Sequence, residues 1–136
     1  MSISPNLLPF EARSLEASLT VGDLEKSLQW YQQVLGFAED RKHERGGKVI
    51  AVSLRAGSVR LLIGQDDGAK GLDRVKGEGI SLQFTTDQDI DALAQRVKAA
   101  GGTLGLEPTT FPWGVRVFRL QDPDGFRLTI SSSPAG

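Results

Sequence analysis

The two halves of this 136-residue chain carry the same order of hydrophobic patterns. Residues 14–21 alternate apolar and polar side chains, which predicts a strand with one buried face, and the apolar residues of segment 23–36 fall at helical spacing. Three further strand patterns follow this helix, at residues 37–43, 48–54 and 58–63. The first half therefore predicts one strand, one helix and three more strands, in the order βαβββ.

The second half repeats this order. An alternating segment over residues 80–86 precedes a helix that begins at Asp87 or Asp89 and ends at a Gly-Gly pair. Three strand patterns follow in the segments TLGLEP, GVRVFRL and FRLTI, and an Asp-Pro-Asp-Gly turn at residues 122–125 joins the last two. A plan that recurs with a period near half the chain predicts two modules of one kind.

These modules predict a single α+β domain that occupies residues 1–136. We expect module one over about residues 14–64, a polar, glycine-bearing linker or exposed loop over about 65–78, and module two over about 79–132. A chain of this length buries roughly two-thirds of its unfolded surface in one folding unit.

Composition excludes several classes of function. The chain has no cysteine, which removes disulfides, thiolate catalysis and cysteine-based metal sites. Its net charge is -1 with Lys and Arg scattered, so we expect no nucleic-acid partner. We expect no membrane partner either, because no apolar run approaches the roughly 18 residues of a membrane span. The N-terminus lacks the pattern of a signal peptide, which predicts a cytoplasmic protein.

Polar residues mark one face of the predicted first and last strands. Each module has one helix, which covers one face of its sheet, and the opposite face of these strands is too polar for a dry core. Two curved mixed sheets placed side by side would enclose a polar cleft. The residues of that face are Glu16, Ser18, Thr20, Ser81, Gln83, Thr85, Arg127 and Thr129.

Three segments resemble the vicinal oxygen chelate superfamily, the group of glyoxalases, bleomycin resistance proteins and extradiol dioxygenases. They are LTVGDLEKSLQWYQQVLGF in the first module, FTTDQDIDALAQRVKAAGG in the second, and PWGVRVFRLQDPDGFRLTI near the end. The resemblance covers nearly the whole chain and implies paired βαβββ modules around a cleft. Its most specific element is the Trp-Gly segment followed by the Asp-Pro-Asp-Gly turn.

The resemblance also implies where metal-dependent members carry their ligands. These positions fall on Glu16, near Arg60, on Ser81 or Gln83, and on Thr129. Only Glu16 is a good ligand, and a divalent catalytic metal needs three or more nitrogen or oxygen donors. A nearby Arg60 would oppose a cation further. We therefore expect no metal, no cofactor and no metal-dependent catalysis.

Because the metal-ligand pattern is missing, the chain resembles the metal-free branch of the superfamily, the bleomycin-type resistance proteins. Such a protein binds a small aromatic or peptide-like molecule and acts by sequestering a drug. The cleft groups offer hydrogen bonds and charge, and an aromatic side chain offers a stacking surface. The candidate ligand-binding residues are Glu16, Arg60, Ser81, Gln83, Trp113, Arg116, Phe118, Arg127 and Thr129.

An enzymatic alternative stays open at this point. The chain could be a lyase or isomerase that uses Glu16 as a general base without metal, since a carboxylate among apolar walls has a raised pKa. A metal-dependent version would recruit the ion through Glu16, Gln83 and water.

Structural interpretations compete with each assignment. Glu16 could instead pair with Arg60 or Arg127 across the cleft, and Trp113 could anchor a loop. Tyr31 falls on the apolar stripe of the first helix, which predicts a core residue. The resemblance further implies a homodimer, in which the cleft often lies at the junction of the two chains.

Overall fold

The computed structural model describes residues 8–71 and 73–134 of the chain. The first βαβββ unit comprises β1 (Ala17–Val21), α1 (Leu24–Gln33), β2 (Ala38–Arg45), β3 (Lys48–Ala56) and β4 (Val59–Gln65). The second comprises β5 (Ser81–Thr86), α2 (Ile90–Ala99), β6 (Leu104–Thr110), β7 (Arg116–Gln121) and β8 (Arg127–Ser132). The predicted α+β fold of two βαβββ modules is confirmed.

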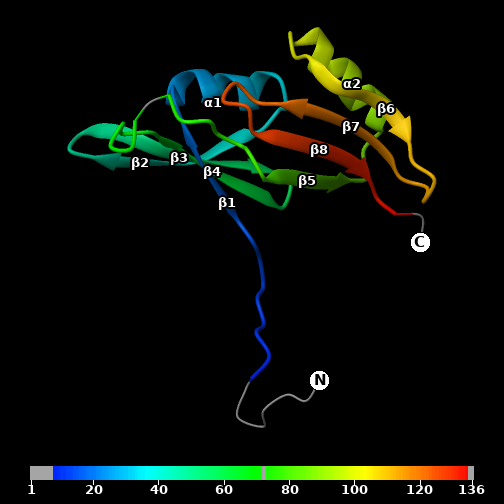
Figure 1. The fold of residues 1–136 in the computed structure, drawn as a ribbon, viewed down its shortest axis with the longest axis horizontal. Helices are drawn as coiled ribbons and strands as arrows, with labels where there is room; N and C mark the ends of the chain where they lie inside the picture. Colours follow the sequence, from blue (N-terminus) through cyan, green and yellow to red (C-terminus); the bar gives the residue numbers. More distant parts are fainter. Residues whose placement is uncertain (1–7, 72, 135–136) are drawn as a thin grey trace.

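Both modules build the same four-stranded mixed sheet. The strand order is β1-β4-β3-β2 in the N-terminal sheet and β5-β8-β7-β6 in the C-terminal sheet. The first and last strands of each module run parallel, with Leu19 opposite Ile63 and Phe84 opposite Ile130, and the other neighbours are antiparallel. Figure 1 shows the two sheets side by side, with α1 and α2 along one side of the molecule.

Aspartates cap both helices at the residue that directly precedes the first helical residue. Asp23 Oδ1 accepts a 3.1 Å hydrogen bond from the amide of Lys26, and Asp89 Oδ1 accepts one of 3.0 Å from the amide of Ala92. A side-chain oxygen at this position satisfies an amide that has no partner within the helix. The structure thus assigns the second cap to Asp89 rather than Asp87.

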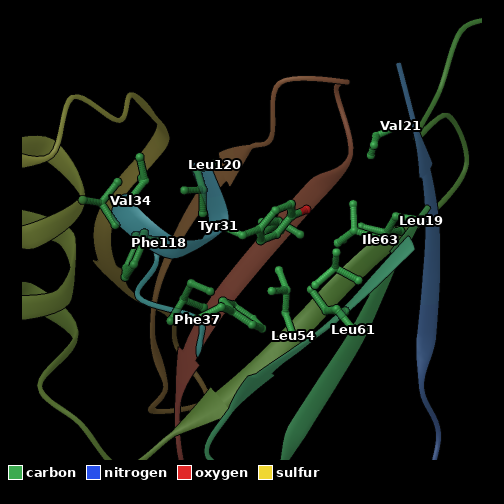
Figure 2. Packing of buried hydrophobic residues seen from close by; sticks show 14 of the residues in the cluster. Leu19, Val21, Tyr31, Val34, Phe37, Leu54, Leu61, Ile63, Phe118 and Leu120 are labelled. Atoms are coloured by element: carbon green, nitrogen blue, oxygen red, sulfur yellow. The ribbon is translucent and has the colours of Figure 1, made fainter. Parts of the chain in front are cut away.

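One hydrophobic core runs through both modules. Tyr31 of α1 is fully buried, which confirms its predicted place in the core, and it packs edge-on against Phe37 with ring centroids 5.7 Å apart. Phe37 in turn packs edge-on against Phe84 of the second module at 6.0 Å. Figure 2 shows Tyr31 and Phe37 among Leu54 and Leu61 of the N-terminal sheet and Phe118 and Leu120 of the C-terminal sheet. Burial of this continuous apolar surface holds the modules together.

The segment between the modules, which the sequence predicts as a linker or exposed loop, is anchored at two points. Asp66 is buried and accepts hydrogen bonds from Lys76 Nζ at 2.7 Å, from Arg74 at 3.1 Å and from the amide of Gly68 at 2.9 Å. Gly77 is also buried, against the backbone of Gly125. Asp66 and Gly77 therefore hold the segment against the protein at two points, while most of the described residues between them are exposed.

In the parts of the chain that the structure describes, no helix is both long enough and apolar enough to cross a membrane.

Candidate functional site

An open hollow lies on the face of the C-terminal sheet that points away from the core. Its volume is about 440 Å³, which falls within the usual range for small-molecule sites. Strand register brings its side chains together: Ser81 lies opposite Arg127 and Gln83 opposite Thr129, and these two β8 residues lie opposite Gln121 and Arg119 of β7. The polar residues that line the hollow are Ser81, Gln83, Arg119, Gln121, Arg127 and Thr129.

The hollow is positively charged. Arg119 and Arg127 are exposed, and no acidic residue is among those that line it. Within the described part of the chain, neither arginine forms an ion pair. Two guanidinium groups without a neutralising carboxylate are suited to a ligand that carries negative charge.

An aromatic pair adjoins the hollow. The guanidinium carbon of Arg119 lies 5.7 Å from the centroid of the Phe111 ring, and the Trp113 ring packs on Phe111 with centroids 5.0 Å apart. Trp113 is 71% exposed, so it does not anchor its loop by burial in the protein. Arg119 therefore connects the polar hollow to an exposed aromatic surface.

Four of the residues predicted from the sequence meet in this hollow. Ser81 and Gln83 of β5 and Arg127 and Thr129 of β8 were expected on one face because each pair is separated by two positions, and the structure places them together. Thr129 is the only one of the four that is buried, since neighbouring side chains on both flanking strands cover it.

Two predicted residues of β7 point to the opposite side of the sheet. Phe118 is 1% exposed and belongs to the hydrophobic core, so a ligand in the hollow cannot reach it. Arg116 faces α2, where it donates hydrogen bonds of 2.7 and 2.8 Å to Asp91 and lowers the pKa of that carboxyl. The placement of these residues in the cleft was wrong by one position, because side chains alternate along a strand.

Arg119 and Gln121 occupy the hollow in their place, and neither was selected from the sequence. The apolar pair Phe118 and Leu120 would place their strand neighbours on the other face, but Val117 on that face is apolar and buried too, so the sequence signal for Arg119 and Gln121 is ambiguous.

Glu16 and Arg60 lie on the N-terminal module. Glu16 is exposed and directly precedes β1, and Arg60 lies in β4. Arg60 pairs with Asp40 at 3.4 Å, so the expected partnership of Glu16 with Arg60 is not the one formed. Among the described hollows, none is lined by Glu16 together with the residues of the C-terminal hollow.

Comparison with known proteins identifies the family of this chain. A family model described as "Glyoxalase/Bleomycin resistance protein/Dioxygenase superfamily" matches residues 13–130. The chain belongs to this superfamily. A protein named "Probable lactoylglutathione lyase" from Vibrio cholerae serotype O1 is 28% identical over 130 residues, covering 87% of this chain and 88% of its own.

Solved structures of the superfamily share the fold. A member from Sphaerobacter thermophilus matches with a TM-score of 0.72 at 23% identity, over 90% of this chain and 98% of that chain. A mutant glyoxalase I from Zea mays matches with a TM-score of 0.75 at 24% identity, over 90% of this chain and 45% of that chain. One fold supports many activities, so the residues of the site must decide the chemistry.

The residues to which the sequence resemblance assigns the superfamily's metal positions do not fit a catalytic metal. Glu16 offers one carboxylate, Ser81 or Gln83 and Thr129 offer neutral groups, and the nearby Arg60 brings a cation. Zinc and similar ions require several nitrogen, thiolate or carboxylate donors arranged around one point. Within the described residues, no three His, Cys, Asp or Glu side chains cluster in a way that could hold an ion. The groups that line the C-terminal hollow, two arginines with neutral hydroxyls and amides, are suited to hydrogen bonding and to anions.

Proposed function

We propose that this superfamily member binds a small, negatively charged molecule with an aromatic or peptide-like body, and that binding needs no catalytic metal. The observation that carries the proposal is the pair Arg119 and Arg127, which lie in one hollow without an acidic neighbour among its lining residues. A chain with a net charge of -1 concentrates positive charge at this point.

The spacing of the two arginines suits a carboxylate or phosphate. Arg119 lies opposite Thr129 and Arg127 lies opposite Gln121, so the arginines are diagonal neighbours on antiparallel strands. Such neighbours are about 7–8 Å apart, within reach of long side chains that converge on one ligand. Ser81, Gln83 and Thr129 add neutral hydrogen-bonding groups beside them.

The aromatic surface extends the site for the body of the ligand. The ring of Phe111 lies under Arg119, and Trp113 continues it outward. A ligand whose anionic group binds the arginines can place a ring or an apolar peptide segment on this pair. The proposed ligand therefore combines charge and flat apolar surface in one molecule.

The positive charge of the hollow also restricts the kinds of drug that the protein could sequester. A cationic drug would meet two arginines and no acidic side chain in the hollow, whereas a neutral or anionic drug meets hydrogen-bond donors. We place such a sequestering role in the cytoplasm, where the sequence-based expectation puts the protein.

Titration calorimetry with S-benzylglutathione tests the proposal, because this probe carries an aromatic ring, a peptide body and carboxylates. We expect saturable binding that is unchanged by EDTA. Loss of one charged hydrogen bond is worth about 1.5–3 kcal/mol, so Arg119→Gln and Arg127→Gln should each weaken binding by about 10- to 100-fold. Arg55→Gln, at an exposed arginine of the N-terminal sheet, is the matched control and should bind as the unmodified protein does.

Two outcomes would overturn the proposal. One is the absence of heat and of any change in melting temperature with millimolar S-benzylglutathione. The other is binding that EDTA abolishes or that both arginine variants leave unchanged.

The relative named as a probable lactoylglutathione lyase favours a second candidate, a lyase or isomerase. In this alternative Glu16 acts as the general base, either alone or beside a metal that Gln83 and water help to hold. The test is turnover of the hemithioacetal of methylglyoxal and glutathione, with and without added nickel or zinc. Activity that Glu16→Gln abolishes would establish the enzyme, and no turnover under any metal condition would exclude this candidate.

A further inference from the structure

A second hollow lies where the two modules meet, on the side of the sheets that carries the helices. Its volume is about 510 Å³, which falls within the usual range for small-molecule sites. The first module contributes the residues just after α1 and the turn between β3 and β4, and the second contributes residues of β5, α2, β7 and β8. This junction hollow shares no lining residue with the hollow of the C-terminal sheet. An occupant would therefore contact both modules at a separate place.

Apolar side chains form most of the junction hollow. Its deepest residues, among them Phe37 and Phe118, are buried members of the hydrophobic core, and Figure 2 shows these two rings close to Val34. The apolar residues nearer its mouth are only half-buried: Leu35, Ala56, Val59, Phe84 and Leu93. Apolar surface that stays open to water inside a concave site favours a ligand with an apolar body, because binding removes that surface from water.

Aromatic rings give this apolar surface a defined geometry. Phe84 packs edge-on against Phe37, with ring centroids 6.0 Å apart and an interplanar angle of 80°. Phe84 is the half-buried member of the pair, so it is the ring that a ligand can reach. A flat aromatic ligand can extend such an edge-to-face cluster by one more ring.

Arg96 of α2 is the only positively charged residue among those described that line the junction hollow. Its guanidinium lies over Gly36, where a Cβ atom would be 2.9 Å from Cζ of Arg96. The lack of a side chain at Gly36 thus leaves room for the guanidinium at the hollow. In the described part of the chain, Arg96 is exposed and forms no ion pair. It is therefore available to an anionic group of a ligand.

The lining also includes one carboxylate, Asp87. Its Oδ1 accepts a 2.6 Å hydrogen bond from the hydroxyl of Ser133, so this carboxylate already has a donor. One available guanidinium and one carboxylate that is already bonded suit a ligand with a single negative charge. A ligand with several negative charges would meet repulsion from Asp87.

We propose that the junction hollow binds a small aromatic monocarboxylate. Its ring lies against Phe84 and Leu93, and its carboxylate accepts hydrogen bonds from Arg96. The guanidinium fixes the orientation of the ligand, because charged hydrogen bonds to a carboxylate are directional and strong. Since residues of both modules contact the ligand, binding also stabilises the folded protein. This site is independent of the proposed function in the C-terminal hollow.

Titration calorimetry with 1-naphthaleneacetate tests the proposal, and 1-naphthaleneacetamide is the uncharged control ligand with the same ring system. The measurements use the unmodified protein and Arg119→Gln/Arg127→Gln, which lacks the two cations of the C-terminal hollow. We expect saturable binding of the acid to both proteins, together with a rise in melting temperature. The amide should bind about tenfold more weakly, because it lacks the charged hydrogen bond to Arg96.

Two variants separate the charge from the apolar surface. Arg96→Gln should weaken binding of the acid to the level of the amide and leave binding of the amide unchanged. Val59→Trp, at a half-buried residue of the hollow, should fill the space and prevent binding of both ligands, and its own thermal transition shows whether it is folded. Arg41→Gln, at an exposed arginine of β2 that lines none of the described hollows, is the matched control and should bind both ligands as the unmodified protein does.

Three outcomes would overturn the proposal. The first is no heat and no change in melting temperature with millimolar 1-naphthaleneacetate. The second is binding of the acid that needs Arg119 and Arg127, which would assign it to the C-terminal hollow. The third is binding that Arg96→Gln leaves unchanged. The two sites fail separately, because S-benzylglutathione tests the arginines of the C-terminal hollow and the acid and amide pair tests Arg96.

Discussion

The hydroxyl of Tyr31 donates a 2.6 Å hydrogen bond to Oδ2 of Asp122, and the two residues are 91 positions apart in the chain. Tyr31 lies in α1 of the first module, and Asp122 begins the Asp-Pro-Asp-Gly turn of the second. Oδ1 of the same carboxyl accepts the amides of Asp124 and Phe126, each at 2.9 Å. The buried carboxyl of Asp122 therefore receives hydrogen bonds from donors in both modules.

The second aspartate of the turn extends this connection. Asp124 accepts hydrogen bonds from the amide of Gly22 at 2.9 Å and from the hydroxyl of Ser27 at 3.3 Å. Both donors lie at the N-terminal end of α1, where a negative charge is also favourable to the helix dipole. The two aspartates of the turn thus hold α1 in place against the C-terminal sheet.

Tyr31→Phe should lower the free energy of unfolding by about 1–3 kcal/mol, because it leaves a buried carboxylate oxygen without its donor. The change removes one oxygen and creates almost no cavity. Urea denaturation of the variant and of the unmodified protein measures the difference. In a double-mutant cycle with Asp122→Asn, the two losses should not be additive, and additive losses would contradict a direct Tyr31 to Asp122 bond.

Asp122 should make the protein less stable as the pH rises from about 4 toward neutral. Burial raises the pKa of its carboxyl, against the opposing effect of the hydrogen bonds from Tyr31 and the backbone amides. A folded-state pKa above the unfolded value means that the folded protein retains the proton longer, so stability decreases as the pH rises through this interval. Asp122→Asn should remove this slope, as measured by urea denaturation across that pH range. A slope unchanged in the variant would assign it to other groups.

Asp66 should have the opposite pH dependence. The hydrogen bond from Lys76, followed by those from Gly68 and Arg74, lowers the pKa of its carboxyl. Its contribution to stability is therefore present above the unfolded pKa of about 4 and lost as the pH falls below it. Asp66→Asn should lower the melting temperature at neutral pH and reduce the difference between neutral and acid conditions, because it leaves the mostly buried amine of Lys76 without a charged partner.

Asp67→Asn is the control for this prediction. Asp67 is exposed and its Oδ1 accepts the amide of Ala69, a bond that asparagine retains. A decrease in melting temperature equal in both variants would show that Asp66 has no special role.

Gly77→Ala should destabilise the protein more than Gly79→Ala. Both glycines have a positive φ, 76° and 78°, so alanine carries a similar backbone penalty at either position. A methyl group at Gly77 would lie 2.6 Å from the carbonyl oxygen of Gly125, whereas one at Gly79 would meet no atom within 4 Å. The difference between the two melting temperatures measures how closely the inter-module segment packs on the turn. Equal effects would mean that this segment moves away at little cost.

Local sequence signals predicted most of the fold. The alternation of Leu19 and Val21 with polar residues, the helix cap at Asp23 and the turn at 122–125 each depend on a few neighbouring residues, so they can be read without knowledge of the rest. The repeat then fixed the order of elements in both modules.

Periodicity did not predict which face of β7 lines the site. Val117 lies on one face and Phe118 and Leu120 on the other, and all three are buried, so hydrophobicity alone does not identify the core side. The register with β8 decides it, by placing Arg119 opposite Thr129. Arg116 and Phe118 were proposed as ligand contacts for their charge and aromatic ring, and Arg119 and Gln121 were missed.

The sequence by itself determined the repeated βαβββ plan and the turn that joins β7 to β8. Those features depend on residue type and local spacing. Only the tertiary structure decided that Arg119 and Arg127 share one hollow, that Tyr31 binds Asp122, and that Asp66 anchors the segment between the modules. Each of these joins residues distant in sequence, and their proximity is set by strand register and by packing of one module on the other, which local patterns do not encode.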